Sequence, residues 1–144
     1  METRRLSGSI AFTLVAPLPL QNAWERMHWA ARRSFKIALA WEIRGLLTGQ
    51  IPARPIEFAE VKIWRHSIRE PDQDGMIVKA LLDVLQPCSK RHPYGLGIIK
   101  DDRPANCHSS IRHVRALHRT DQCTRVAILA LGGVEFERRR DEAA

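Results

Sequence analysis

The sequence predicts an α+β fold: a two-layer sandwich in which two main helices cover a mixed β-sheet, in the order β-α-β-α-β-β. Short segments of alternating apolar and polar residues, which are typical of strands, occur near both ends of the chain and in its middle. Two longer segments repeat apolar residues every three or four positions, as amphipathic helices do. The chain has 144 residues, the size of one domain, so we expect a single domain over 1–144 with a flexible tail from about residue 137.

The strands are predicted from alternation and from the turn residues that bound them. The first covers residues 7–15 and ends at a proline-rich turn. The second covers 56–64, with a shift in phase near Ala59 that could be a bulge. Further strands are predicted at residues 98–100, 108–117, 125–131 and 134–136. A turn at 119–122 is expected to join two of these into a hairpin.

The two helices have recognisable ends. The first is predicted over residues 23–47, with Asn22 as its N-cap. The second is predicted over 75–86 and ends before Pro87, which cannot continue a helix. Its apolar face should pack on the sheet, leaving Lys79 and Asp83 on the outward face. Because these two are four residues apart, they could simply pair with each other.

Composition restricts the class of protein. The formal net charge is +7 and the sequence pI is about 10.0, which favours an anionic partner, nucleic acid ahead of a membrane surface. The alternative is that the charge only confers solubility. No apolar run is long enough to span a bilayer, and the N-terminus lacks the pattern of a signal peptide, so secretion is not expected.

The three cysteines indicate a reducing cytoplasm. Cys88, Cys107 and Cys123 are odd in number and widely spaced, which does not make a disulfide framework. No cysteine pair has the short spacing of zinc sites. Histidines 108, 113 and 118 have a suitable spacing, but on a strand they would not share one face. Zinc is therefore not expected.

Closely spaced aspartates are concentrated between residues 70 and 104. Asp72 and Asp74 are two apart, so in an extended segment both carboxylates point to one side. Asp101 and Asp102 are adjacent, so only one of them should join that pair. A hard divalent cation is a common reason to gather carboxylates, and Lys79 could hold a phosphate or stabilise the transition state. The pattern suits metal-assisted phosphodiester hydrolysis, although helix caps and turns would also explain the aspartates.

Three segments also carry a family resemblance. Asp72-Gln73-Asp74, then Lys79 to Leu85, then Gly97 to Asp102 resemble the D-x-D-N…K-x-x-x-D-x-L…D-D signature of RusA-like Holliday-junction resolvases, small endonucleases of phages and prophages. The motif region covers about a quarter of the chain. The order of the flanking elements is similar, including an asparagine after the proline-rich turn. Two departures are that Gly75 replaces the usual asparagine and that Lys79 comes one residue late.

The resemblance implies a homodimer that nicks four-way DNA junctions symmetrically with Mg²⁺, for which Mn²⁺ can substitute, in DNA recombination and repair. Asp72, Asp74 and Asp102 match the metal-binding aspartates, and Lys79 matches the catalytic lysine. Asp83 matches an acidic position of the helix. Asp83 would hold these groups in position without binding the metal itself, and Asp101 could do the same.

Basic residues other than Lys79 are candidates for contacts with DNA. They are Arg26, Arg33, Lys90, Arg91, Lys100 and Arg103. Arg26, Arg33 and Arg44 fall nearly in line on the outer side of the first predicted helix, although such a row is usually just solvated. For the dimer interface we expect the edge of the hairpin rather than Trp29 and Trp41.

Two other functions stay open at this point. One is a binding module that holds a junction or replication fork without cutting it. The other is a structure-selective nuclease that acts on other branched DNA or on RNA. All three share the expected basic surface, so charge does not separate them.

Overall fold

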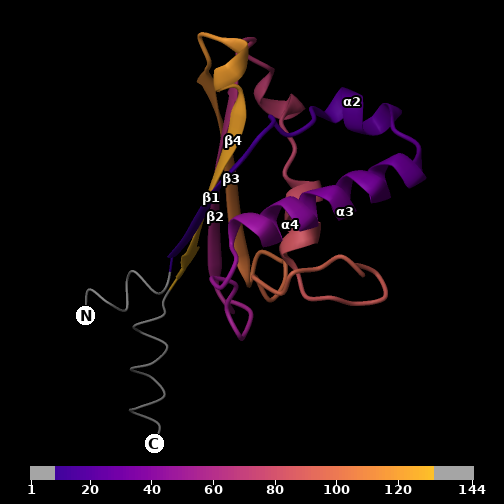
Figure 1. The fold of residues 1–144 in the computed structure, drawn as a ribbon, viewed down its shortest axis with the longest axis vertical. Helices are drawn as coiled ribbons and strands as arrows, with labels where there is room; N and C mark the ends of the chain where they lie inside the picture. The colour runs from indigo at the N-terminus through magenta and orange to yellow at the C-terminus, as the bar shows by residue number, and fades with distance from the viewer. Residues whose placement is uncertain (1–8, 132–144) are drawn as a thin grey trace, which may run out of the picture.

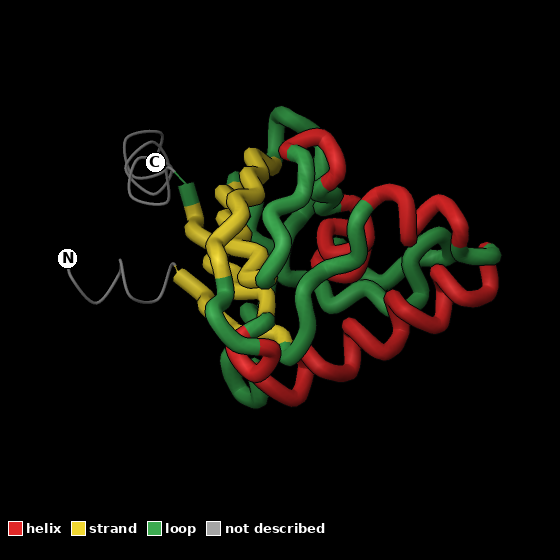
Figure 2. The backbone as a smooth tube through the Cα atoms, turned by 90° about the horizontal axis from the view of Figure 1, so that it is seen from above, coloured by secondary structure: helices red, strands yellow, loops and turns green. Residues whose placement is uncertain are grey.

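The structure is a computed structural model, which describes residues 9–131 of the chain. Four strands form one mixed sheet, and three α-helices all lie on the same side of it (Figures 1 and 2). The strands are β1 (Ser9–Leu14), β2 (Ala59–Ser67), β3 (Cys107–Arg115) and β4 (Cys123–Ala130). The helices are α2 (Gln21–Arg26), α3 (Trp29–Leu46) and α4 (Lys79–Leu85), with 3₁₀ turns η1 (Gln73–Gly75) and η2 (Arg119–Asp121). The predicted α+β class with a mixed sheet is confirmed.

The strand order is β1-β4-β2-β3, so the predicted hairpin is wrong. β4 runs antiparallel to both β1 and β2, whereas β3 pairs parallel to β2 on its other edge. The segment between β3 and β4 therefore crosses the end of β2, where Ala116 N donates to Ser67 O at 3.0 Å. β4 and β2 are the two inner strands, and the inward positions of β2 are buried along its whole length.

The first predicted helix is two helices. Met27 and His28 interrupt it, and His28 Nδ1 accepts a hydrogen bond from Ala30 N at 3.2 Å, which caps α3. Asn22 is not a cap, because α2 already begins at Gln21. The predicted row of arginines is therefore divided, with Arg26 on α2 and the others on α3.

Other predicted boundaries also move. β2 begins at Ala59 and alternates regularly to Ser67, so the shift in phase marks the start of the strand and not a bulge. Residues 98–100 form only an isolated bridge, between Ile56 and Ile99. α4 is shorter than predicted, because η1 and an extended segment precede it. The predicted strand at 134–136 and the tail lie outside the described residues.

The core lies between the sheet and the helices. Every second residue of β1 and β2 and most of the corresponding residues of β4 are buried on the side of the sheet that carries the helices. The largest fully buried side chains include Leu14, Ile43, Ile63, Leu81, Leu85 and Ile128. Burying each such side chain contributes about 1.5–3 kcal/mol, so this layer fixes α4 against the sheet. Among residues 9–131 no helix has the length and apolar character needed to cross a membrane.

The loop after α4 is tied back to the end of the helix. Leu96 N donates to Val84 O at 2.9 Å, and the amides of Ile98 and Ile99 both donate to Leu85 O. Gly95 is required here, because a Cβ on it would lie 2.4 Å from Gln86 O. These bonds satisfy the carbonyls at the end of α4 and direct the chain that follows towards the start of α4.

Candidate functional site

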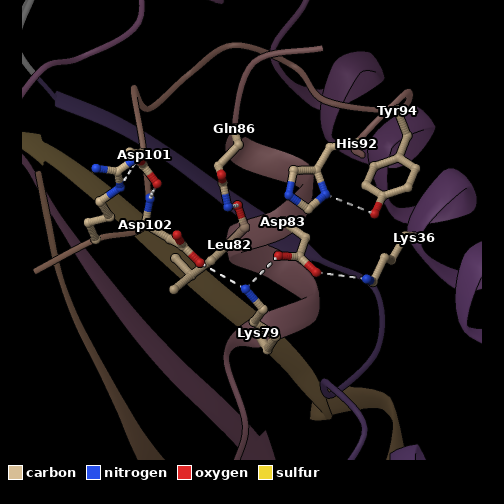
Figure 3. Close-up of polar contacts among 10 residues, drawn as sticks. Lys36, Lys79, Leu82, Asp83, Gln86, His92, Tyr94, Asp101 and Asp102 are labelled. Carbon is tan, nitrogen blue, oxygen red and sulfur yellow. Dashed lines mark hydrogen bonds and ion pairs between the residues drawn. The ribbon is translucent and has the colours of Figure 1, made fainter. Parts of the chain in front are cut away.

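Lys79 is the first residue of α4 and links two carboxylates. Its Nζ lies 2.9 Å from Asp102 Oδ2 and 3.0 Å from Asp83 Oδ1 (Figure 3). Asp83 is one helical turn further along α4, whereas Asp102 comes from the loop before β3, 23 residues away in the sequence. The side chain of Lys79 is 57% exposed, so the ammonium group can still reach a ligand from solvent.

Asp83 is buried, contrary to the prediction that it lies on the outward face of its helix. It is 3% exposed, and its Oδ2 accepts a hydrogen bond from Lys36 Nζ at 2.7 Å. Its contact with Lys79 is an ion pair without an aligned hydrogen bond. The reason for the burial is that α4 is covered on nearly all sides, by the sheet, by α3 and by the returning loop. The predicted alternative, that Lys79 and Asp83 pair with each other, is confirmed.

Lys36 was missed by the sequence reasoning, which placed no partner for Asp83 on the first helix. Its ammonium group lies 5.7 Å from the ring centroid of Trp24 and 5.8 Å from that of Tyr94. Both aromatic faces attract a cation, so Lys36 is held between them and Asp83. A separation of 47 residues leaves no local spacing signal for this pair.

Asp101 and Asp102 have different partners. Asp101 Oδ1 accepts from the backbone N of Asp102 at 2.7 Å, and its Oδ2 pairs with Arg103 Nε at 2.8 Å. Asp101 therefore stabilises the turn, and of the two only Asp102 contacts Lys79. The hydrogen bond from Lys79 holds the pKa of Asp102 below its ordinary value of 3.8. The same bond raises the pKa of Lys79 above 10.5, although partial burial opposes the rise.

These pKa directions predict how pH changes the stability that Lys79 provides. The folded protein binds protons on Asp102 less readily than the unfolded chain, so this stability is present above pH 3.8 and is lost as pH falls further. On the alkaline side it is present below pH 10.5 and is lost as Lys79 deprotonates above that value. We expect the difference in unfolding free energy between wild type and Lys79→Met to be constant between these limits and to shrink outside them. Urea titrations across pH test this, and a difference that persists unchanged at pH 2 would contradict it.

Asp72 and Asp74 do not join this group. Both are exposed, and neither side chain forms a hydrogen bond or ion pair with another described residue. The extended segment expected for them is wrong, because η1 turns the chain at Gln73–Gly75. Among residues 9–131 no three histidine, cysteine, aspartate or glutamate side chains are arranged to hold a metal ion. The carboxylates have the chemistry that a hard cation prefers, but this arrangement does not bring them to one ion.

Asp72 instead lies at the rim of a hollow of about 670 Å³ between the proline-rich turn and the ends of β2 and η2. Asn22, Arg69 and Arg119 also line it. Asn22 and Asp72, which both belong to the resemblance to the resolvases, therefore border the same hollow. Arg65 lies in its wall and is buried, donating to Leu18 O at 2.7 Å. Burial lowers the pKa of Arg65 from its ordinary value. Sequence reasoning missed this arginine, because the predicted strand ended at residue 64, whereas β2 continues to Ser67 and Arg65 takes an inward position in it.

The basic residues predicted to contact DNA fall into two groups. Lys100 pairs with Glu57 at 3.6 Å, and Arg103 pairs with Asp101, so both already have acidic partners. All six are exposed, and the other four form no ion pair with another described residue: Arg26 on α2, Arg33 on α3, and Lys90 and Arg91 on the loop after α4. Arg33 shares a hollow of about 230 Å³ with Trp41, Arg44 and Tyr94.

Comparison with models of known protein families finds no match to this chain, and a search of curated proteins finds none either. A proposal about function therefore rests on the sequence, the fold and the contacts of the described residues.

Proposed function

We propose that the protein is a divalent-cation-dependent endonuclease that resolves four-way DNA junctions by paired, symmetric nicks. The observation that supports it is the contact of Lys79 with Asp102. These residues come from the middle and the end of the resolvase-like pattern, and the fold brings them to hydrogen-bond distance. The net charge of +7 supports a polyanionic substrate.

In this proposal Lys79 contacts a phosphate oxygen at the cut. Its exposed ammonium group is fixed in position by Asp83 and Asp102, which limits the motion that a free lysine would have. A positioned cation stabilises the negative charge that develops on a phosphate during hydrolysis. Since two symmetric nicks need two sites, the active species is a homodimer. Among the described strands, β3 lies at one edge of the sheet, and the side of β3 that pairs with no described strand is the proposed contact in place of the hairpin.

The test is cleavage of a synthetic mobile four-way junction with Mg²⁺ and with EDTA. We expect Asp72→Asn and Asp74→Asn each to abolish cleavage while binding of the junction persists or improves, since each removes a cation ligand and also a charge that repels phosphate. Asp121→Asn is the matched control, because Asp121 is also an exposed aspartate in a 3₁₀ turn. Loss of binding together with cleavage, in a folded variant, would contradict the role.

A non-cleaving junction or fork binder is the second candidate. The observation that favours it is that Asp72 and Asp74 lie apart from Asp102, whose carboxylate is neutralised by Lys79. A binder would retain the junction with a steep dependence on salt and would cut nothing with either Mg²⁺ or Mn²⁺. A panel of junction, fork, duplex and single-stranded RNA then separates a resolvase from a nuclease of other specificity.

A further inference from the structure

The side of the sheet that faces away from the helices has a composition unlike the core side. No described helix packs on it, as Figures 1 and 2 show. The strand positions that alternate with the buried ones point to this face. They include Thr13 of β1, Lys62, Trp64 and His66 of β2, His108 and Arg112 of β3, and Arg125 and Ala127 of β4.

One row across this face places a tryptophan between two arginines. Trp64 is in register with Arg125 on β4 and with Arg112 on β3. Neighbouring strands are about 4.8 Å apart, so the three side chains stand next to one another. Trp64 is half-buried, whereas both arginines are exposed. An aromatic ring between two cations on a sheet offers a flat surface for a base and two partners for phosphates.

The rest of the face carries little net charge. Lys62, His66 and His108 lie around the row, and the carboxylate of Glu60, on the same face, is 3.8 Å from the Lys62 ammonium group. Burial lowers the pKa of His66 from its ordinary value, and the neighbouring charge of Arg125 lowers it further. Both effects disfavour the charged form of His66, so Arg112 and Arg125 carry the positive charge of this face. Two copies of this surface would place like charges against each other.

Trp64 lines two hollows on the sheet. One, of about 490 Å³, is lined by Trp64, His66 and Arg125 with mostly apolar residues of β1, β3 and β4. The other, of about 290 Å³, is lined by Trp64, Arg112 and the Lys62–Glu60 pair with other residues of β2 and β3. Each hollow thus combines the tryptophan with an arginine, which is what an unstacked base and its phosphate require.

We propose that this open face binds single-stranded nucleic acid, with a base stacked on Trp64 and phosphates held by Arg112 and Arg125. Charge complementarity selects this occupant over a second copy of the chain. The face lies on the opposite side of the sheet from α4 and Lys79, so the binding is separate from the proposed cleavage and does not rest on it.

The test is fluorescence anisotropy of a labelled oligothymidylate with the full chain, in EDTA so that cleavage plays no part. We expect Trp64→Ala to weaken binding about tenfold or more, the loss of one stacked base, and Trp64→Phe to retain most of the affinity. Trp41→Ala is the matched control, since Trp41 is 66% exposed on α3, and it should bind as wild type. Thermal unfolding of each variant shows that the fold is kept.

A second pair of variants tests the phosphates. Arg112→Gln with Arg125→Gln should lower the slope of log affinity against log salt by about one to two, whereas Arg54→Gln, which changes an exposed arginine outside the sheet, should leave it unchanged. The proposal is overturned if Trp64→Ala binds as wild type or if Trp41→Ala loses as much. It is also overturned if sedimentation shows that Trp64→Ala changes self-association instead, which would make the face an interface between copies.

Discussion

Replacing Asp83 with asparagine is expected to destabilise the folded protein by about 3 kcal/mol, because removing one partner of a buried ion pair leaves the other uncompensated. Asp83 is 3% exposed and lies between two lysines. Lys79 can turn its largely exposed side chain to water once the carboxylate is lost, whereas the Lys36 side chain is only 18% exposed. The loss should therefore arise mainly through Lys36.

Urea unfolding of a mutant cycle measures this directly. Lys36→Met should be nearly as harmful as Asp83→Asn, and Lys79→Met should cost under about 1 kcal/mol because that pair is mostly exposed. The double variant Lys36→Met with Asp83→Asn should cost clearly less than the sum of the two single effects, since the second change no longer leaves a buried charge unpaired. Additive single effects would show that the 2.7 Å contact contributes nothing to stability.

Replacing Lys79 with alanine is expected to lower the rate of junction cleavage at least about a hundredfold, the usual loss when a positioned group that stabilises the transition state is removed. This result rests on the proposed nuclease function. Junction affinity and the requirement for Mg²⁺ should change little, because one phosphate contact is a small part of the whole interface. Single-turnover cleavage with the junction bound separates rate from affinity.

Lys100→Ala is the matched control, as another exposed lysine on the neighbouring loop with an acidic partner, Glu57. It should cut at the wild-type rate. If Lys79→Ala cuts normally and Lys100→Ala does not, Lys100 holds the catalytic role in place of Lys79, which the extra residue before Lys79 would have displaced. If both cut normally, Lys79 serves only to neutralise Asp83 and Asp102.

Periodicity predicted the elements that are buried on one side. The alternation of β1 follows from burial against a single partner layer and was predicted correctly, whereas α4 is covered on nearly all sides and buries more residues than its predicted apolar face. The predicted hairpin was wrong because β2 lies between β3 and β4 in the sheet. That β3 and β4 are consecutive in the sequence does not reveal that another strand lies between them. Similarly, the break at His28 depends on one side chain that caps the next helix.

In the candidate site, too, only the contact between residues close in the sequence was predictable. The pairing of Lys79 with Asp83 follows from helical spacing and was visible in the sequence. The partner Lys36 and the burial of Asp83 depend on how α3 crosses α4, which no local pattern records. The separation of Asp72 and Asp74 from Asp102 depends on a single 3₁₀ turn, η1, in a segment where spacing alone favoured an extended chain.

The pairing of the strands has a consequence for how the chain folds. β1 pairs with β4, so Ser9 is in register with Leu129, and β2 pairs with β3 and β4. No two described strands pair before residue 107 has been synthesised, which gives the fold a high contact order. Folding should therefore be slow for a domain of this size. During synthesis the apolar residues of β1 and β2 emerge from the ribosome without partners, so this protein completes its sheet only when nearly all of the chain is available.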